Sequence, residues 1–325
     1  MQTLILGHDP AGVRAAAELL SQGELVAIPT ETVYGLAGDA RNAQAVARIY
    51  EAKGRPSFNP LIVHLPDLAA AQRIAVFDKA ALDLATAFWP GALTLVLPLR
   101  QGADIASLVT AGLDTVAIRV PAHPAAQKVL RAFGGPLAAP SANPSGRISP
   151  TTAAHAADPE DGLGGRIAAV LDAGACPVGV ESTIVSWVDG QPALLRPGGI
   201  ASEEIEAALG RPLTQPRINT DAPNAPGQLT SHYAPRADVR LNADAARPGE
   251  LLIGFGPVAG EMTLSETGDL TEAAARLFDL LHQADARGVP IAVAPVPEHG
   301  LGAAINDRLR RAAAPRQGSG VAGTG

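Results

Sequence analysis

Short apolar runs alternate with segments of helical spacing up to about residue 210 of the chain. Runs of five or six apolar residues are typical of β-strands, and runs without polar alternation are typical of strands that are covered on both faces. We therefore expect a sheet with helices packed against it, in an α/β or α+β fold. The predicted strands are ELVAIP (24–29), LIVHL (61–65), LTLVLP (93–98), TVAIRV (115–120), IAAVLD (167–172) and STIVSW (182–187). The predicted helices are AQAVARIYEA (43–52), KAALDLATAF (79–88) and PAAQKVLRAF (124–133).

The hydrophobic pattern stops at about residue 210, which would close a first domain over residues 1–210, and it restarts at about residue 237. Residues 211–236 contain four prolines before Tyr233 and little periodicity, which predicts a long linker. The apolar runs and helical patterns that follow predict a second, smaller α/β domain over residues 237–315. The tail of residues 316–325 is rich in Gly and Ser, and we expect it to be disordered.

The composition argues against a long polyanion as the main ligand. The formal charge is −7, and residues 1–200 hold 14 Lys and Arg against 17 Asp and Glu, while residues 201–325 hold 11 against 15. Strong direct binding of nucleic acid needs a basic excess, so it is not expected here. A small phosphate compound needs only a few local cations and is compatible with this balance. Aromatic residues make up only 3% of the chain, so the core must consist mainly of Ala, Leu, Val and Ile.

Cysteine use and hydropathy bear on the compartment. Cys176 is the only cysteine, which excludes an internal disulfide and a zinc site with several cysteines. The start MQTLILGHDP has no basic segment followed by a long apolar run, and no stretch approaches 18 consecutive apolar residues. We therefore expect a soluble protein of the reducing cytoplasm, with no membrane partner.

The segment KGRPSFNPLIVH, residues 53–64, places two cations between a predicted helix and a predicted strand. Gly54 suits a left-handed helix cap, and Pro56 pushes Arg55 into an extended conformation. Lys53 and Arg55 would then leave a rigid corner of the backbone, as a site for anionic phosphate requires. A helix cap with two solvated cations, followed by a turn, explains the same pattern equally well.

Other polar residues gather where predicted strands end. The segment PTETVYGLAGDA (29–40) puts hydroxyls and a carboxylate at a strand-to-helix turn, where open α/β sheets bind ligands, although the same residues could cap a helix. The loop in LAAPSANPSGRISPTT (137–152) could hold phosphate oxygens or be an ordinary polar loop. Glu181 in VESTIVSW and Arg196 in LLRPGG fit either a ligand site or a turn.

Arg119 lies inside the apolar run TVAIRV, and a buried arginine needs an anionic or hydrogen-bonding partner. That partner could be internal, such as Asp114 or Asp172, or it could be a substrate carboxylate. The common signatures are missing: the chain has no GxxxxGK[ST] phosphate loop, no GxSxG elbow and no HExxH motif. If ATP binds here, it binds without the usual phosphate loop.

Taken together, these segments resemble a known family. PTETVYGL, KGRPSFNPLIVH, FWPGALTLVL, TVAIRVPAH, PLAAPSANPSGRISPTT, ESTIV and LLRPGG occur in the order of the YrdC-like domain. The second half, with SHYAP and GLGAAINDRLRRAA, is similar to the C-terminal domain of two-domain L-threonylcarbamoyladenylate synthases. The resemblance covers about residues 8–315. It implies a YrdC-like twisted mixed sheet with flanking helices, followed by a smaller Rossmann-like α/β domain.

The resemblance also implies an activity. The family makes L-threonylcarbamoyl-AMP from L-threonine, bicarbonate or CO2, and ATP, with Mg²⁺, and releases pyrophosphate. The product feeds the t6A37 modification of tRNA through a downstream tRNA threonylcarbamoyl-transferase machinery.

The matching motif positions imply site residues. Lys53 and Arg55 would be catalytic and face the ATP phosphates. Tyr233 would let the linker fold over the nucleotide as a lid. The positions implied around ATP are Arg55, Asn59, Thr115, Ser141, Asn143, Ser149, Arg196 and Tyr233. The positions implied around threonine are Thr32, His64, Arg119, the backbone at Ala139, and Ser182. No residue is implied as a metal ligand.

Two other functions were weighed, and one of them stays open at this point. A YrdC-like module could hold RNA or a nucleotide without synthesis, and it would need a strongly basic face that the charge of residues 1–200 disfavours. A related domain acts in hydrogenase maturation together with Cys-rich zinc motifs, which the single cysteine excludes in this chain.

Overall fold

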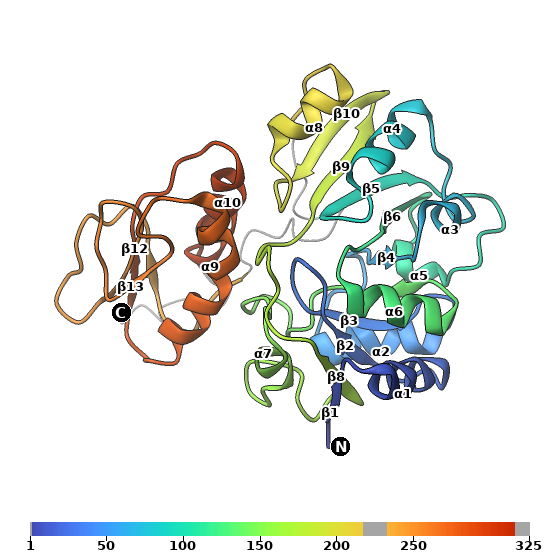
Figure 1. Cartoon of the computed structure of the whole chain (residues 1–325), viewed down its shortest axis with the longest axis horizontal. Coiled ribbons are helices and arrows are strands. Elements are labelled where there is room, and N and C mark those ends of the chain that lie inside the picture. The colour runs from blue at the N-terminus through green and yellow to red at the C-terminus, as the bar shows by residue number, and fades with distance from the viewer. Residues whose placement is uncertain (1, 217–232, 316–325) are drawn as a thin grey trace, which may run out of the picture.

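The structure is a computed structural model that describes residues 2–216 and 233–315. Within these ranges the chain forms two sheets, each with its own helices. Figure 1 shows two bodies, and helices α9 (Leu270–Asp285) and α10 (Leu301–Ala312) of the second body face the first. Most of the predicted linker and the whole predicted tail, residues 217–232 and 316–325, lie outside the described residues.

Ten strands of the first body form one mixed sheet. They are β1 (Leu4–Gly7), β2 (Val26–Ile28), β3 (Gly35–Asp39), β4 (Ile62–His64), β5 (Leu93–Pro98), β6 (Thr115–Arg119), β7 (Leu137–Ala138), β8 (Ala169–Asp172), β9 (Thr183–Val188) and β10 (Gln191–Arg196). Their order across the sheet is β1-β8-β2-β3-β7-β4-β6-β5-β9-β10. β4 pairs with β6 in parallel, whereas β5 pairs with β6 antiparallel. The expected mixed α/β sheet is confirmed.

Within the described residues, eight helices accompany this sheet. They are α1 (Pro10–Ser21), α2 (Ala43–Lys53), α3 (Leu68–Gln72), α4 (Lys79–Phe88), α5 (Ser107–Thr110), α6 (Pro124–Phe133), α7 (Ala153–Ala157) and α8 (Ser202–Leu209). The three predicted helices correspond to α2, α4 and α6. The Asn42 side chain caps the start of α2, and Gly54 ends it in the left-handed conformation, with φ 57°. That cap sets the backbone corner from which Arg55 leaves.

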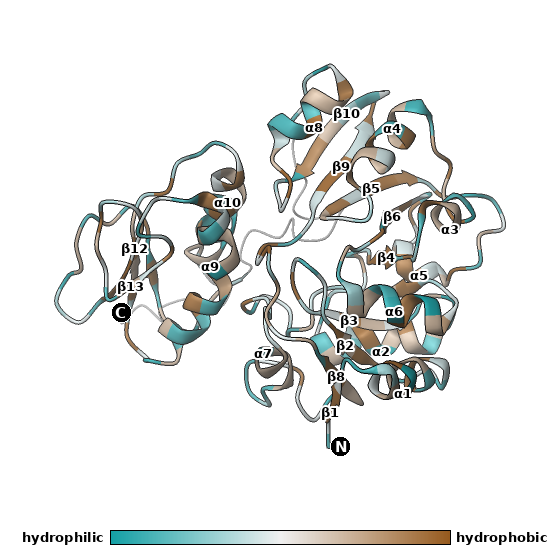
Figure 2. Ribbon diagram, viewed as in Figure 1, coloured by the Kyte–Doolittle hydropathy of each residue, from teal (hydrophilic) through white to brown (hydrophobic). Residues whose placement is uncertain are grey.

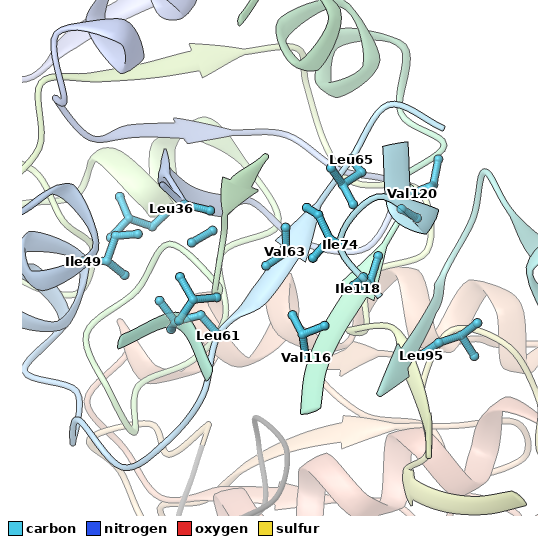
Figure 3. Packing of buried hydrophobic residues seen from close by; sticks show 14 of the residues in the cluster. Leu36, Ile49, Leu61, Val63, Leu65, Ile74, Leu95, Val116, Ile118 and Val120 are labelled. Carbon is cyan, nitrogen blue, oxygen red and sulfur yellow. The ribbon is translucent and has the colours of Figure 1, made fainter. Parts of the chain in front are cut away.

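Helices cover both faces of the sheet, as the continuous apolar runs predicted. Along β2, Val26 and Ile28 pack with α1 and α6, whereas the alternate residue Ala27 packs in the larger core with α2. Figure 3 shows Val63, Ile118 and neighbouring side chains of that core. Each such side chain contributes about 1.5–3 kcal/mol when it is fully buried. Figure 2 shows hydrophobic residues along the strands and mixed hydropathy around helices such as α1.

One difference from the sequence-based prediction lies at β3. Residues 29–40 were expected to form a strand-to-helix turn, but they form a loop followed by β3, which pairs antiparallel with β2. Gly35 and Gly38 interrupt the apolar pattern of this strand, and close packing requires a glycine at position 38. A Cβ on Gly38 would lie 3.0 Å from a Leu25 methyl and 3.1 Å from an Ile49 methyl.

The second body is a smaller sheet of four parallel strands, in the order β11-β14-β12-β13. The strands are β11 (Val239–Arg240), β12 (Leu251–Gly254), β13 (Met262–Thr263) and β14 (Ile291–Val293). Helices α9 and α10 accompany them, and the side chain of Asp269 caps the N-terminus of α9. The expected smaller α/β domain is therefore present.

The two bodies share one apolar cluster. Val33 and Val180 of the first body pack in the same cluster as Phe278 and Ile305 of the second, and Tyr233 joins them. The second body is therefore packed against the first through apolar side chains. Among residues 2–216 and 233–315, no helix has the length and apolar composition that crossing a membrane would require.

Candidate active site

A cavity lies where several strands of the large sheet end. Carboxyl ends of strands are where open α/β sheets bind ligands. His64 and Arg119 are the last residues of the parallel neighbours β4 and β6, and Arg196 is the last residue of β10. The sequence-predicted residues that line the cavity are Thr32, Arg55, His64, Arg119, Ala139, Ser141, Ser182, Arg196 and Tyr233.

Arg119 is buried at the floor of this cavity, and its partner is Glu31. Arg119 Nη2 donates to Glu31 Oε1 at 2.6 Å, and Nη1 donates to Thr32 Oγ1 at 2.8 Å. The suggestion that Asp114 or Asp172 pairs with Arg119 was wrong. The loop after β2 brings a nearer carboxylate, because Glu31 also accepts from the backbone N–H of Ala122 at 3.0 Å, just beyond β6.

The Glu31–Arg119 pair is a charged pair inside the protein. Burial alone would raise the pKa of Glu31, but the charge and hydrogen bond of Arg119 outweigh it and hold that pKa below its usual value. Thr30 shapes the loop, since its hydroxyl donates to the Val33 carbonyl at 2.6 Å and lies 2.8 Å from the Thr32 hydroxyl. Thr32 is thereby presented to both the cavity and Arg119.

His64 is a neutral side chain in the cavity wall. Its ring is buried, and Nδ1 lies 3.3 Å from the Ile62 carbonyl oxygen. Burial, and then the positive charge of Arg119, lower its pKa to about 3. At neutral pH the imidazole therefore offers one donor and one acceptor, and it carries no charge that would compete with Arg119 for an anion.

Arg55 and Lys53 leave the same corner but have different surroundings. Arg55 lines the cavity, where Nε donates to the Asn59 carbonyl at 3.1 Å and Nη2 donates to the Pro60 carbonyl at 2.9 Å. Burial lowers its pKa to about 10, so it is charged at neutral pH. Lys53 does not line the cavity. Its ammonium group donates to the carbonyls of Ser141 and Asn143, and burial lowers its pKa well below the usual value.

Lys53 therefore anchors the loop that carries Ser141, rather than projecting into the cavity as the sequence suggested. The catalytic role of Lys53 stays a prediction. Asn143 is buried on the same loop, where its Nδ2 donates to the carbonyls of Pro144 and Arg147. Asn143 Oδ1 accepts no hydrogen bond from the described residues, and the same holds for the buried Asn59 Oδ1.

Ser182 and Arg196 form the opposite wall. Ser182 Oγ lies 2.7 Å from Thr94 Oγ1, and Arg196 Nη2 donates to the Ser182 carbonyl at 2.9 Å. The register of β10 against β9 shifts between Leu194 and Arg196, and such a bulge re-aims the side chain that follows it. Of the two alternatives for Arg196, the surface turn is wrong: the residue ends a strand, and its side chain lines the cavity.

Tyr233 closes one side of the cavity from the end of the predicted linker. It is the first described residue after the gap, it is buried, and it has φ 61°, in the left-handed region that a bulky residue seldom adopts. Its ring packs 5.4 Å from the ring of Phe278 on α9. The lid prediction for the rest of the linker falls on residues 217–232, outside the described residues.

Three other predicted residues lie outside the cavity wall. Ser149 is fully buried behind it, and its hydroxyl donates to Glu181 Oε1 at 2.6 Å. Asn59 is buried beside Arg55. Thr115 begins β6, four residues before Arg119, so it lies at the opposite end of that strand, about 13 Å away.

Sequence reasoning left Glu181 open between a ligand site and a turn, and it missed Arg308. Glu181 lines the cavity, and its Oε2 accepts from Arg308 Nε at 3.0 Å. Arg308 comes from α10 of the second body and is fully buried. A signal was present in the sequence: Arg308 is at helical spacing from Ala304 and Ile305, on the apolar face of its helix. The resemblance pointed to this segment but not to this residue.

No group of three or more His, Cys, Asp or Glu side chains that could hold a metal occurs within residues 2–216 and 233–315. The carboxylates closest to the site, Glu31 and Glu181, are each paired with an arginine. The unpaired amide oxygens of Asn59 and Asn143 are of the hard type that Mg²⁺ prefers. Among the described residues, the carboxylates of the site are therefore taken up by arginines and do not form a cage for a metal ion.

Comparisons with known proteins agree with this geometry. The family described as "Telomere recombination" (Sua5/YciO/YrdC) matches residues 18–198, and the family "Threonylcarbamoyl-AMP synthase, C-terminal domain" matches residues 200–314. The threonylcarbamoyl-AMP synthase of Bacillus subtilis is 43% identical, over 95% of this chain and 94% of its own. That of Pyrococcus abyssi is 41% identical, over 94% of each chain.

The fold comparison gives the same result over nearly the whole length. The crystal structure of Pyrococcus abyssi Sua5 complexed with L-threonine superposes with a TM-score of 0.87 at 39% identity, covering 96% of this chain and 98% of that one. The chain belongs to the Sua5/YrdC family, in its two-domain form with a threonylcarbamoyl-AMP synthase C-terminal domain.

Proposed function

We propose that this protein synthesises L-threonylcarbamoyl-AMP from L-threonine, bicarbonate or CO2, and ATP, with release of pyrophosphate. The observation that carries the proposal is the convergence of three buried arginines, Arg55, Arg119 and Arg196, on one small cavity. The reaction brings together a carboxylate, a carbamate and a triphosphate, and these anions need fixed positive charge. The relatives at 41–43% identity over most of both chains, named threonylcarbamoyl-AMP synthase, support the same reaction.

Arg119 and Thr32 suit the threonine half of the site. A guanidinium on a strand end can bind a substrate carboxylate, and nearby hydroxyls and the neutral His64 can hold the amino acid's own polar groups. The Pyrococcus abyssi protein, whose fold this chain shares, was crystallised with L-threonine. We infer that Thr32, His64, Arg119, Ala139 and Ser182 bind threonine in this chain.

Arg55 and Arg196 suit the phosphate half. The threonine amine attacks CO2, a C–N bond forms and one proton leaves, which yields a carbamate. A carbamate oxygen then attacks the α-phosphorus of ATP, the bond to the pyrophosphate oxygen breaks, and pyrophosphate departs with its electron pair. No covalent enzyme intermediate is needed. These residues contribute by holding two anions in contact and by stabilising the charge on phosphorus.

Mg²⁺ belongs to this proposal as an ion carried by the substrate ATP, where it neutralises phosphate charge. The product is a reactive mixed anhydride, so we propose that a downstream tRNA threonylcarbamoyl-transferase machinery consumes it to make t6A37. A cytoplasmic location, expected from cysteine use and hydropathy, stays a prediction.

A second candidate, a non-catalytic module that binds RNA or a nucleotide, is disfavoured. Among the described residues that line the cavity, arginines outnumber carboxylates three to one, although the whole chain is acidic. Three arginines in one cavity suit a small anion, whereas binding along a nucleic-acid backbone needs a basic excess, which the acidic chain lacks.

The test is pyrophosphate release from ATP at fixed Mg²⁺, with and without L-threonine and bicarbonate. The proposal requires release that depends on both co-substrates. Arg55→Ala should abolish it, and circular dichroism of the variant checks that losing the donors to the Asn59 and Pro60 carbonyls has not unfolded the chain. Arg131→Ala, which truncates an exposed arginine of α6, is the matched control. Normal activity in Arg55→Ala refutes the phosphate role, and ATP binding without pyrophosphate release favours the binding module.

A further inference from the structure

Glu181 is a carboxylate in a cavity that we propose for anions. It is the acidic side chain among the described residues that line the cavity, and it is 6% exposed. Burial alone would raise its pKa, but Arg308 and Arg196 more than offset this and keep the pKa below its usual value. Glu181 is therefore ionised at neutral pH, and an ionised carboxylate repels a triphosphate.

Both oxygens of Glu181 are engaged by residues behind the cavity wall. Ser149 Oγ donates to Oε1 at 2.6 Å, and Arg308 Nε donates to Oε2 at 3.0 Å. Ser149 belongs to the first body. Arg308 lies on α10 of the second body, 127 positions after Glu181 in the sequence. The second body thus supplies the counter-charge for a carboxylate of the first.

Arg308 is held in place by contacts to both bodies. Its Nη1 donates to the Pro197 carbonyl, which follows β10 and Arg196, and to Asp307 Oδ2 at 3.1 Å. Its guanidinium carbon lies 5.6 Å from the centre of the Tyr233 ring, within range of a cation–π contact. The side chain has no exposed surface, so solvent does not screen its charge.

We propose that Arg308 is a positioning residue for the nucleotide: it neutralises Glu181 and turns this carboxylate away from the ATP phosphates. This inference rests on the proposed function, because it assigns the anion as ATP. It gives the second domain a part in substrate binding that does not depend on the linker. Threonine carries its own ammonium group beside its carboxylate, so its binding depends less on this neutralisation.

The experiment compares ATP affinities by calorimetry in full-length variants, without co-substrates, so that turnover does not enter. In Arg308→Gln we expect the Kd for ATP to rise at least about tenfold, or about 1.4 kcal/mol, and the Kd for threonine to rise less. Arg308→Lys keeps the charge and should stay within about threefold of wild type, or about 0.7 kcal/mol. Arg310→Gln is the matched control, since Arg310 lies on the same helix, exposed and paired with Glu298.

The decisive variant is the double change Glu181→Gln/Arg308→Gln. Removing the carboxylate together with its counter-charge should restore most of the ATP affinity that Arg308→Gln loses. A purely structural role for Arg308 predicts no such rescue. The inference is overturned if Arg308→Gln binds ATP like wild type, or if the double variant binds no better than Arg308→Gln.

A further variant covers the case in which Arg308→Gln does not fold. Glu181→Gln alone should bind ATP at least as tightly as wild type, because a repelling charge is gone. A tenfold loss in this variant would show that Glu181 itself serves the nucleotide, and it would overturn the inference. A wild-type chain that binds ATP but releases no pyrophosphate would refute the proposed function and leave these affinity comparisons valid.

Discussion

Replacing Arg119 by methionine should destabilise the first domain strongly. The substitution removes the donors to Glu31, Thr32 and the Gly91 carbonyl, and it keeps much of the apolar stem. The pair is buried, with side-chain exposures of 4% for Arg119 and 9% for Glu31. Removing one partner of a buried ion pair leaves the other charge uncompensated, which typically costs about 3–5 kcal/mol.

A double variant separates the ion-pair energy from the hydrogen bonds. In Glu31→Gln/Arg119→Met no buried charge is left alone, and the amide oxygen can still accept from the Ala122 N–H. We therefore expect the free energy of unfolding to fall by only about 1–2 kcal/mol, the cost of the lost hydrogen bonds. Both variants lack the guanidinium, so both should show a raised threonine KM, while only the single variant shows the large loss of stability.

The assay is urea unfolding followed by tryptophan fluorescence. The only two tryptophans, Trp89 and Trp187, lie in the first domain, so the signal reports this domain and not the second. In wild type, ionised Glu31 contributes fully to the free energy of unfolding above its ordinary pKa of 4.5. This contribution is lost as the pH falls through the lowered pKa of Glu31 in the folded state. A double variant no more stable than Arg119→Met would refute the reasoning, and so would a loss in Arg119→Met below about 1 kcal/mol.

Three more outcomes follow from the structure. Lys53→Met leaves two buried carbonyls without their donor, so unfolding monitored by fluorescence should show a loss of about 2–4 kcal/mol, and an unchanged midpoint would contradict the anchoring role. Because His64 has a pKa of about 3, the pH profile of kcat/KM should show no inflection from it between about pH 5 and 8; an inflection that vanishes in His64→Gln would contradict this. His155 stacks on His282 at 4.0 Å between the two domains, and burial lowers the pKa of both, that of His155 to about 4. Between the ordinary histidine pKa of 6.5 and about 4 the unfolded chain takes up protons that the folded chain does not, so Tm should fall as the pH is lowered through this range, and His155→Phe should flatten the dependence.

The sequence predicted those elements whose pattern is local. The helices over residues 43–53, 79–88 and 124–133 were found with their boundaries correct to a residue, because apolar spacing and caps such as Gly54 lie within the element itself. The glycine-containing β3 was not found, since its place depends on the close approach of Leu25 and Ile49, which no local pattern records.

For the site, the sequence by itself determined which residue types were available and in which order, and motif order was enough to identify the family. Only the tertiary structure decided which side chains meet. Arg119 pairs with Glu31, which is 88 positions away in the sequence, and Arg308 pairs with Glu181, which is 127 positions away. The Lys53 ammonium donates to two backbone carbonyls and does not line the cavity. The physical reason is that a buried charge is satisfied by whatever partner the closed fold places within hydrogen-bond reach, and that partner is set by packing between distant segments rather than by neighbours along the chain.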